Sequence, residues 1–401
     1  MQPFFPVDLT VTLAIPTAAV GALWLLLNRD RLGRRQLIVL AMWFALAALV
    51  AAGILWAPDP TSAVRSAAYF IVLGTTPLLA AFAVAADETR TRQFLLVFLA
   101  SGLVYIGIAM IALLTGELGG GLVMGANRIS VARALLFVPL IAIPLLVWHR
   151  LGPREWILVA LASLGIFLAF ATSSRAPILF FIVVGSALTL GALARSRHRT
   201  RALGRAGAVV LGTVVVFVAF AGALPERSPA RFGLLLDVAA EVMDEPAPTD
   251  GGEGVEEPPP EGEDGPTGGE SVARRADLLR MAWLLFLAHP VAGAGTAGYE
   301  AAAGYEYPHN LVLHLASEFG LAGLAWLGAL VVLTLLTWRP NSTVSVALGA
   351  LLAFLVLNAM VSNGIYENRM LWGVWLVLLA GPLEVLPAKA GSEARVRQLA
   401  R

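Results

Sequence analysis

The sequence predicts a polytopic all-α membrane protein, and three observations support that prediction. First, 58% of the 401 residues are hydrophobic and only 14% are charged, whereas soluble domains are about a quarter charged. Second, apolar runs of about 20 residues recur along the chain, which is the length a helix needs to cross a bilayer. Third, the basic residues gather on alternate connections between these runs, as they do in multi-pass membrane proteins.

Eleven apolar runs are long enough to be membrane spans. We expect each to be a helix, because a helix satisfies its own backbone hydrogen bonds in lipid and the runs lack the alternating polarity of barrel strands. The predicted spans are 7–27, 36–56, 65–86, 94–114, 130–147, 156–173, 176–194, 206–224, 310–337, 343–361 and 370–387.

The distribution of basic residues predicts the orientation of the spans. One set of alternating connections, together with the tail 388–401, carries 18 of the 28 basic residues, and the positive-inside rule makes that side cytoplasmic. The N-terminus is then outside and the C-terminus inside. We expect the first span to be retained, because no basic residue precedes it and four arginines follow it, the reverse of a signal peptide.

The overall charge and the absence of cysteine exclude several classes of function. The chain has 28 basic and 27 acidic residues, so its net charge gives no general attraction to nucleic acid. The absence of cysteine excludes disulfides, thiolate metal sites and cysteine nucleophiles. We expect neither a metal nor a cofactor, because no cluster of metal ligands is evident in the sequence.

One external loop, 225–309, is much longer than the others. Its middle, 244–271, is rich in Pro, Gly and Glu and is predicted to be a disordered insert, since it has almost nothing apolar to bury. Ser271 is a plausible N-cap for a helix over 272–289. The apolar portion of that helix, 281–288, is too short to span, so we expect the helix to lie along the outer interface.

The ten remaining basic residues are all arginines at or near the external face. We interpret Arg65, Arg227, Arg231 and Arg274 as snorkelling or ion-paired side chains. Arg175 and Arg280 are predicted to be functional, because neither has an acidic neighbour in the sequence on the same membrane face except Asp277. The other arginines are candidates for substrate binding: Arg128, Arg133, Arg275 and Arg369.

An arginine cluster at headgroup depth suits a phosphate or pyrophosphate, which guanidinium groups bind bidentately. The N-terminus of the ninth span adds a helix dipole of the right sign. His309 stands at this helix start and could accept a proton near neutral pH.

Asn310, His314 and Glu318 are spaced four residues apart and predict a polar stripe on the ninth helix. All three are candidates for substrate binding. For His314 and Glu318 we favour an interhelical hydrogen-bonded pair.

The segments RMAWLLFLAHPVAGAG (280–295) and YPHNLVLHLASEFGLAG (307–323) resemble the signature of the O-antigen ligase and polymerase superfamily. In that family an arginine and a tryptophan precede a His-Pro-x-x-Gly-x-Gly turn, and a His-Asn pair opens a helix with Glu-x-Gly-x-x-Gly. Ser174-Arg175 also matches. The chain differs in its eleven predicted spans, where many members have twelve, and in reading Ala126-Asn127-Arg128 at the family's Asn-Pro-Asn-like element.

The resemblance implies a bacterial glycosyltransferase of the cytoplasmic membrane with its active site outside. Such an enzyme moves a glycan from a polyprenyl (undecaprenyl) pyrophosphate donor to the hydroxyl of an acceptor, which is a glycan or a lipid-linked molecule such as lipid A-core. His309 would be the general base, and Arg175 and Arg280 would stabilise the pyrophosphate. Direct displacement would invert the anomeric centre. Two alternatives stay open: a polymerase of lipid-linked repeat units, and a transporter or flippase.

Overall fold

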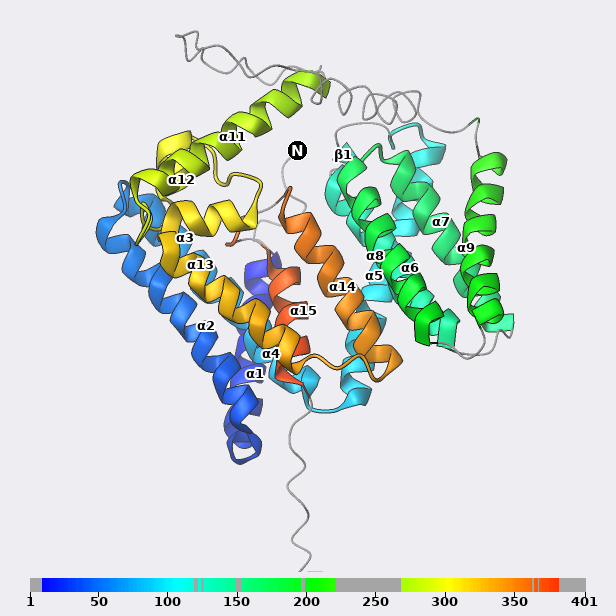
Figure 1. Cartoon of the computed structure of the whole chain (residues 1–401), viewed down its shortest axis with the longest axis horizontal. Coiled ribbons are helices and arrows are strands. Elements are labelled where there is room, and N and C mark those ends of the chain that lie inside the picture. Colours follow the sequence, from blue (N-terminus) through cyan, green and yellow to red (C-terminus); the bar gives the residue numbers. More distant parts are fainter. Residues whose placement is uncertain are drawn as a thin grey trace, which may run out of the picture. The chain divides into compact units, whose positions relative to one another are not determined.

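The computed structural model describes residues 9–118, 122–123, 126–148, 153–195, 199–220, 222, 268–362, 364–366 and 368–381. The chain forms two compact units, one of Met1–Leu95 with Leu279–Arg401 and one of Leu96–Leu278. Helices make up almost all of the described residues in both units (Figure 1).

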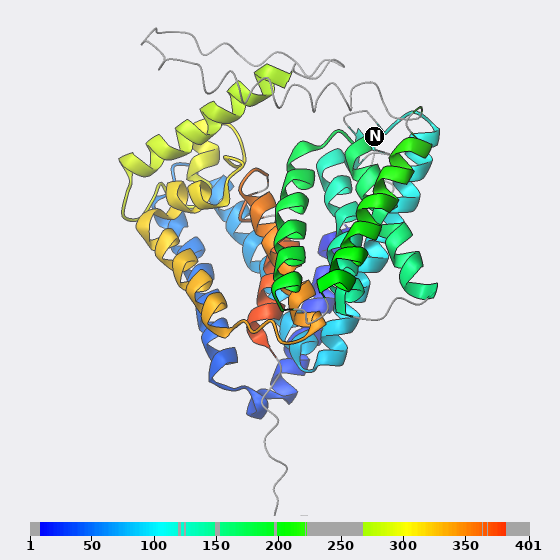
Figure 2. The same cartoon turned by 45° about the vertical axis from the view of Figure 1, so that its right-hand side comes forward.

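The first unit contains the helices at both ends of the chain. Helices α2 and α13, far apart in sequence, lie side by side in both views (Figures 1 and 2), and the Trp326 indole donates a 2.7 Å hydrogen bond to the carbonyl of Met42. The elements wholly in this unit are α1 (Leu9–Leu27), η1 (Arg29–Arg31), α2 (Arg34–Gly53), η2 (Ile54–Trp56), α3 (Pro60–Tyr69), η3 (Phe70–Gly74), α4 (Thr75–Ala85), α12 (Gly298–Ala303), α13 (Leu311–Thr337), α14 (Thr343–Ala359) and α15 (Arg369–Ala380).

Aromatic side chains fill the core of the first unit. Trp43 stacks on Phe70 with ring centroids 5.3 Å apart, and it meets the edge of Trp372 at 5.9 Å. All three side chains are almost completely buried. Because large aromatic rings remove much apolar area from solvent, this cluster ties α2, η3 and α15 together.

The second unit is a bundle around α6. Residues 131–144 of α6 are buried throughout, and α6 packs against α7, α8 and α9. The elements wholly in this unit are β1 (Leu122–Val123), β2 (Ala126–Asn127), α6 (Arg128–Trp148), α7 (Pro153–Ala171), α8 (Arg175–Arg195) and α9 (Arg199–Ala219). Helices α5 (Glu88–Leu114) and α11 (Gly268–Ala288) each have residues in both units.

The predicted all-α class is confirmed, and each of the eleven predicted spans coincides with apolar helix. Among the described residues, the only strands are the paired dipeptides β1 and β2. Six helical segments are long and apolar enough to cross a membrane, and five shorter apolar helices account for the other predicted spans. The chain is a multi-pass membrane protein, while the count of eleven spans and their orientation stay predictions.

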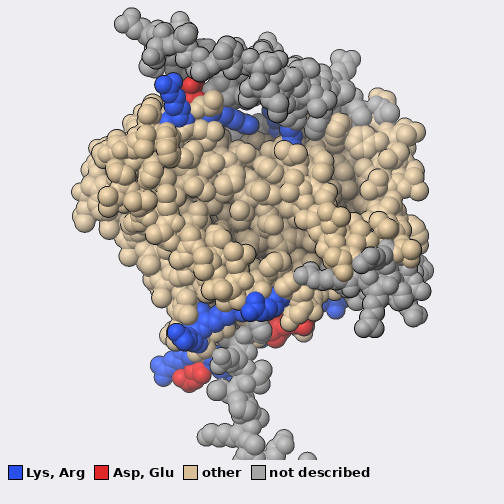
Figure 3. Space-filling view, in the orientation of Figure 1, with Lys and Arg blue, Asp and Glu red and all other residues tan. Residues whose placement is uncertain are grey.

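The distribution of charged side chains agrees with this class. On the visible face of the first unit, blue and red groups lie at the two ends and an uncharged band separates them (Figure 3). Large apolar side chains are exposed between the ends, among them Leu335 at 68% and Val332 at 54%. Such exposure is expected where lipid, rather than water, surrounds a helix.

Three element boundaries differ from the predictions. The range 65–86 is not one α-helix: the helix begins at Pro60, where the Asp59 carboxylate accepts the Thr61 N–H, and the π-helix η3 interrupts it. The last helix ends at Ala380, because Gly381 has a φ of 60°, and not at 387. The N-cap predicted at Ser271 is wrong, since α11 already begins at Gly268.

The end of α11 at Ala288, directly before His289-Pro290, confirms the predicted stop. The predicted disordered insert lies outside the described residues up to residue 267, and its last four residues, 268–271, are helical and not disordered.

Candidate functional site

The turn that follows α11 docks on the backbone of α13. The N–H groups of Ala294 and Gly295 donate to the carbonyls of Ser317 and Glu318, both at 2.9 Å. Gly293 and Gly295 have φ angles of 68° and 89°, in the left-handed region that favours glycine. The glycines of the HPVAGAG segment therefore let two backbones meet.

Helix α13 is kinked at the point where this turn docks. Gly320 has φ 59° and ψ −145°, and the next N–H, from Leu321, donates to the carbonyl of Pro290 at 2.8 Å. A Cβ on Gly320 would lie 2.6 Å from the Pro290 carbonyl oxygen, and one on Gly293 would lie 2.1 Å from the Glu318 carbonyl carbon. The turn and the kink thus interlock, and hydrogen bonds to the turn replace bonds that the kink removes from the helix.

A buried polar cluster lies on α13 just before the kink. His314 and Glu318 are both completely buried, with Nε2 of His314 3.3 Å from Oε1 of Glu318. The Ile365 N–H donates to Nδ1 of His314 at 3.3 Å, so the ring proton of a neutral His314 is on Nε2, facing the carboxylate. The two residues therefore contact each other along one helix, but Nε2 and Oε1 make no hydrogen bond in the described structure, so the prediction of an interhelical hydrogen-bonded pair is wrong in its geometry.

Tyr366, between α14 and α15, completes the cluster. Its hydroxyl donates to Oε2 of Glu318. Burial, followed by the neighbouring Glu318 carboxylate, raises the pKa of Tyr366 well above its usual range, which keeps the hydroxyl protonated and able to donate. Tyr366 was not among the predicted site residues, because no local sequence pattern connects it with a carboxylate 48 positions earlier. The protein partners of Glu318 and His314 favour a structural role for both.

His309 and Asn310 stand directly before α13. The Asn310 side chain accepts the Leu313 N–H at 3.0 Å and donates to the Met360 carbonyl at 3.2 Å. Asn310 is therefore the N-cap of a helix that begins at Leu311, one residue after the predicted start of the ninth span at 310.

The backbone of His309 is in the left-handed region, with a φ of 58°. A residue with a Cβ is uncommon there, and such strain concentrates at functional sites. The imidazole is half-buried and meets the edge of the Tyr307 ring, with centroids 4.9 Å apart. A strained, partly accessible imidazole at a helix N-terminus can bind an anion or transfer a proton.

The candidate arginines of the first unit differ in their surroundings. Arg280 is exposed on α11, about 12 Å of helix before Ala288, and its guanidinium has no hydrogen bond or ion pair with any residue that the structure describes. Arg369 opens α15 and is half-buried. Arg65 pairs with Glu300 at 2.7 Å, which confirms its interpretation as an ion-paired side chain.

The second unit holds the remaining candidates. Arg175 is half-buried and opens α8 after a buried turn in which Ser173 has a φ of 59°. Arg133 is only 4% exposed and donates to the Ser130 hydroxyl at 3.2 Å. Arg128 opens α6. Arg275 is exposed on α11.

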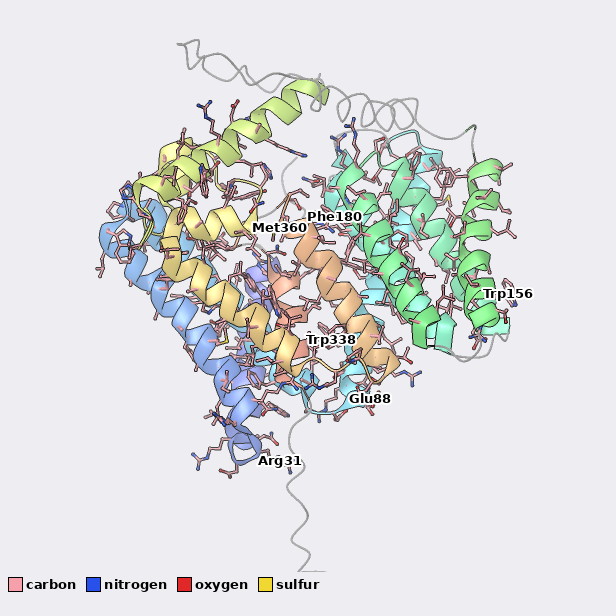
Figure 4. The ribbon with its side chains drawn as sticks, in the orientation of Figure 1. Arg31, Glu88, Trp156, Phe180, Trp338 and Met360 are labelled. Carbon is pink, nitrogen blue, oxygen red and sulfur yellow. The ribbon has the colours of Figure 1, made fainter. Side chains whose placement is uncertain are left out.

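Arg128 and Arg175 lie at the same end of the second unit. The antiparallel helices α6, α7 and α8 follow one another through short connections, so α6 and α8 begin at the same end. Figure 4 agrees, with Phe180 of α8 at one end of this unit and Trp156 of α7 at the other.

In the described part of the chain, no group of three or more His, Asp or Glu side chains is placed to hold a metal ion. The His309 end of the first unit offers an imidazole, guanidinium groups and helix termini. These groups bind anions and move protons.

A comparison with protein families matches residues 158–328 to the family described as O-antigen ligase. The matched range includes Arg175, Arg275, Arg280, His309, Asn310, His314 and Glu318. Comparisons with curated proteins and with solved structures gave no match. The matched range contains the turn, the kink and the His-Asn pair that carried the resemblance, so residues 158–328 of this membrane protein are similar to the O-antigen ligase family.

Proposed function

We propose that this protein transfers a glycan from a polyprenyl pyrophosphate donor to an acceptor hydroxyl at the outer face of the cytoplasmic membrane. The observation that carries the proposal is the conformation of His309, held with φ 58° directly before the N-cap of α13. The family match supports a ligase or polymerase type of reaction on lipid-linked glycans in the membrane.

The proposed reaction is a single displacement at the anomeric carbon. The acceptor oxygen forms the new glycosidic bond while the bond to the pyrophosphate oxygen breaks, and the hydroxyl proton goes to the imidazole of His309. Attack from the face opposite the leaving group inverts the anomeric configuration. The imidazole must be neutral before the step, because only an unprotonated ring nitrogen can accept the hydroxyl proton.

The leaving pyrophosphate needs charge neutralisation more than it needs a proton. The exposed guanidinium of Arg280 has no protein partner in the described structure and can bind two phosphate oxygens at once. We assign Arg175 the same role, on the Ser174-Arg175 motif and its position at the start of α8. Arg128, Arg133, Arg275, Arg369 and Asn310 are proposed to contact the donor or acceptor. No metal is part of the proposed step, so transfer should persist in excess chelator.

The decisive experiment uses purified full-length protein, a lipid-linked glycan and candidate acceptors, with products identified by mass. Transfer to a non-identical acceptor supports a ligase, and growth of lipid-linked repeats supports the polymerase. Translocation of the lipid without any covalent product would support the transporter and overturn the proposal.

Variants test the two assigned roles separately. We expect His309→Ala to lower single-turnover transfer by about 10² to 10⁴ while leaving donor binding unchanged. We expect Arg280→Ala to weaken donor binding, and Arg280→Lys to restore it only in part, because an ammonium lacks the planar fork. Arg274→Ala, a neighbouring exposed arginine on the same helix, is the control. Wild-type transfer by His309→Ala would show that the base is another group.

A further inference from the structure

A cavity of about 560 Å³ lies in the first unit at the end opposite to His309. It is lined by the start of α2, the start of α5, the connection between α13 and α14, and the end of α15. In Figure 4, Glu88 and Trp338, which both line it, lie at one end of this unit and Met360 lies at the other. Its volume is in the range of about 300 to 1,000 Å³ that is typical of small-molecule sites.

One wall of the cavity is suited to a phosphate. Arg339 is exposed, and the only hydrogen bond of its guanidinium in the described structure is a 3.4 Å contact to the adjacent Trp338 carbonyl, so most of the guanidinium donors are available. Ser342 is the N-cap of α14 and uses its oxygen as an acceptor for the Ser345 N–H, which leaves its hydroxyl proton free to donate. Arg339 and the helix N-terminus both favour an anion.

The side of the cavity formed at the start of α5 is suited to an ammonium group. Asp87 and Glu88 both line the cavity. Asp87 is engaged by Arg90, whose Nε lies 3.2 Å from its carboxylate. Glu88 is exposed and has no cationic partner among the described residues, so its carboxylate can accept hydrogen bonds from a ligand.

The two arginines and two carboxylates of the lining balance in charge. Arg35 is the second arginine, and its guanidinium already donates to the carbonyls of Leu379 at 2.6 Å and Leu378 at 2.8 Å. A ligand that carries only a negative charge would be attracted by Arg339 but repelled by the carboxylates of Asp87 and Glu88. A zwitterion that carries a phosphate and an ammonium a short distance apart satisfies both walls.

The position of the cavity points to a lipid as the source of this zwitterion. It lies at the end of long apolar helices, where lipid headgroups gather. Trp338 lines it, and the indole N–H donates to the Ser345 carbonyl at 3.2 Å, the amphipathic arrangement typical of tryptophan at a membrane interface. We propose that this cavity binds a phospholipid headgroup of the phosphoethanolamine type, with its phosphate on Arg339 and Ser342 and its ammonium on Glu88.

The test is a binding titration on purified full-length protein in non-ionic detergent, followed by native mass spectrometry. Phosphatidylethanolamine, phosphatidylcholine and phosphatidylglycerol are compared at matched acyl chains. We expect phosphatidylethanolamine to bind most tightly, because a trimethylated ammonium cannot donate hydrogen bonds to Glu88 and a glycerol headgroup carries no cation. Soluble glycerophosphoethanolamine serves as the competitor without acyl chains and should compete only weakly.

Two variants address the two walls. Arg339→Ala and Glu88→Gln should each weaken binding of phosphatidylethanolamine by about tenfold or more, as expected for loss of a charge-assisted hydrogen bond. Both side chains are exposed, so neither change should prevent folding. Arg29→Ala is the matched control, since Arg29 is 77% exposed near the same end and does not line the cavity.

Four results would overturn the proposal. Equal binding of phosphatidylcholine, or an unchanged affinity of Glu88→Gln, would eliminate the ammonium contact. Tighter binding of phosphatidylglycerol would indicate a simple basic patch. Competition by glycerophosphoethanolamine at lipid-like concentrations would identify a soluble ligand. None of these results bears on the transfer reaction, because no proposed transfer residue lines the cavity.

Discussion

Replacing Gly293 by alanine should destabilise the protein far more than replacing Gly304. Both glycines have left-handed backbones, with φ 68° and 65°, so both substitutions carry the same conformational cost of about 1 to 2 kcal/mol. They differ in what the new methyl group meets. At Gly304 nothing lies within 4 Å, whereas at Gly293 the Glu318 carbonyl carbon lies at 2.1 Å and the Phe319 nitrogen at 2.3 Å.

The additional cost at Gly293 follows from the hydrogen bonds of the interlock. Backbone atoms cannot move aside as a flexible side chain can, so the turn must separate from α13. Three bonds are then at risk: from Ala294 to Ser317, from Gly295 to Glu318 and from Leu321 to Pro290. At about 0.5 to 1.5 kcal/mol each, the loss of the three bonds adds about 1.5 to 4.5 kcal/mol to the cost that the two variants share.

The measurement is thermal or denaturant unfolding of both variants in the same detergent, with the fraction of monodisperse protein as a second readout. Transfer activity should decrease along with stability in Gly293→Ala, because the turn that follows the helix of Arg280 docks on the helix that follows His309. Equal unfolding midpoints for the two variants would refute the interlock, since the clash would then be relieved without loss of hydrogen bonds.

Further predictions concern the buried cluster, the topology and the long loop. Tyr366→Phe should destabilise by about 1 to 3 kcal/mol in equilibrium unfolding, since it leaves the buried Glu318 carboxylate without its donor; a wild-type midpoint would contradict this. Because the pKa of Tyr366 is raised in the folded state, its stabilising contribution should be complete below about pH 10 and decrease as the pH rises beyond it, which unfolding across that range would detect. A reporter fused after Arg201 should report cytoplasm and one near Gly252 the outside, and an external signal at Arg201 would reverse the topology. Deleting 246–269 should leave folding and transfer largely intact, because its composition offers little to bury, and loss of folded protein would show otherwise.

The sequence by itself determined the class of the protein and the approximate positions of its helices. Apolar runs interrupted by charge are local features, so hydropathy placed all eleven helical segments. Helical periodicity also predicted the contact of His314 with Glu318, because residues four apart always lie on one face of a helix. The stop before Pro290 followed from the missing N–H of proline.

Which residues of these helices contact one another became clear only from the tertiary structure. The kink at Gly320, the docking of Gly293 and the bond from Tyr366 to Glu318 each join groups distant in sequence. The left-handed conformation of His309 likewise depends on surroundings that hold an uncommon backbone angle. Apolar composition and periodicity specify which face of a helix is buried, but the partner of each backbone N–H and carboxylate depends on packing. That is why the sequence predicted the helices and the structure revealed the interlock.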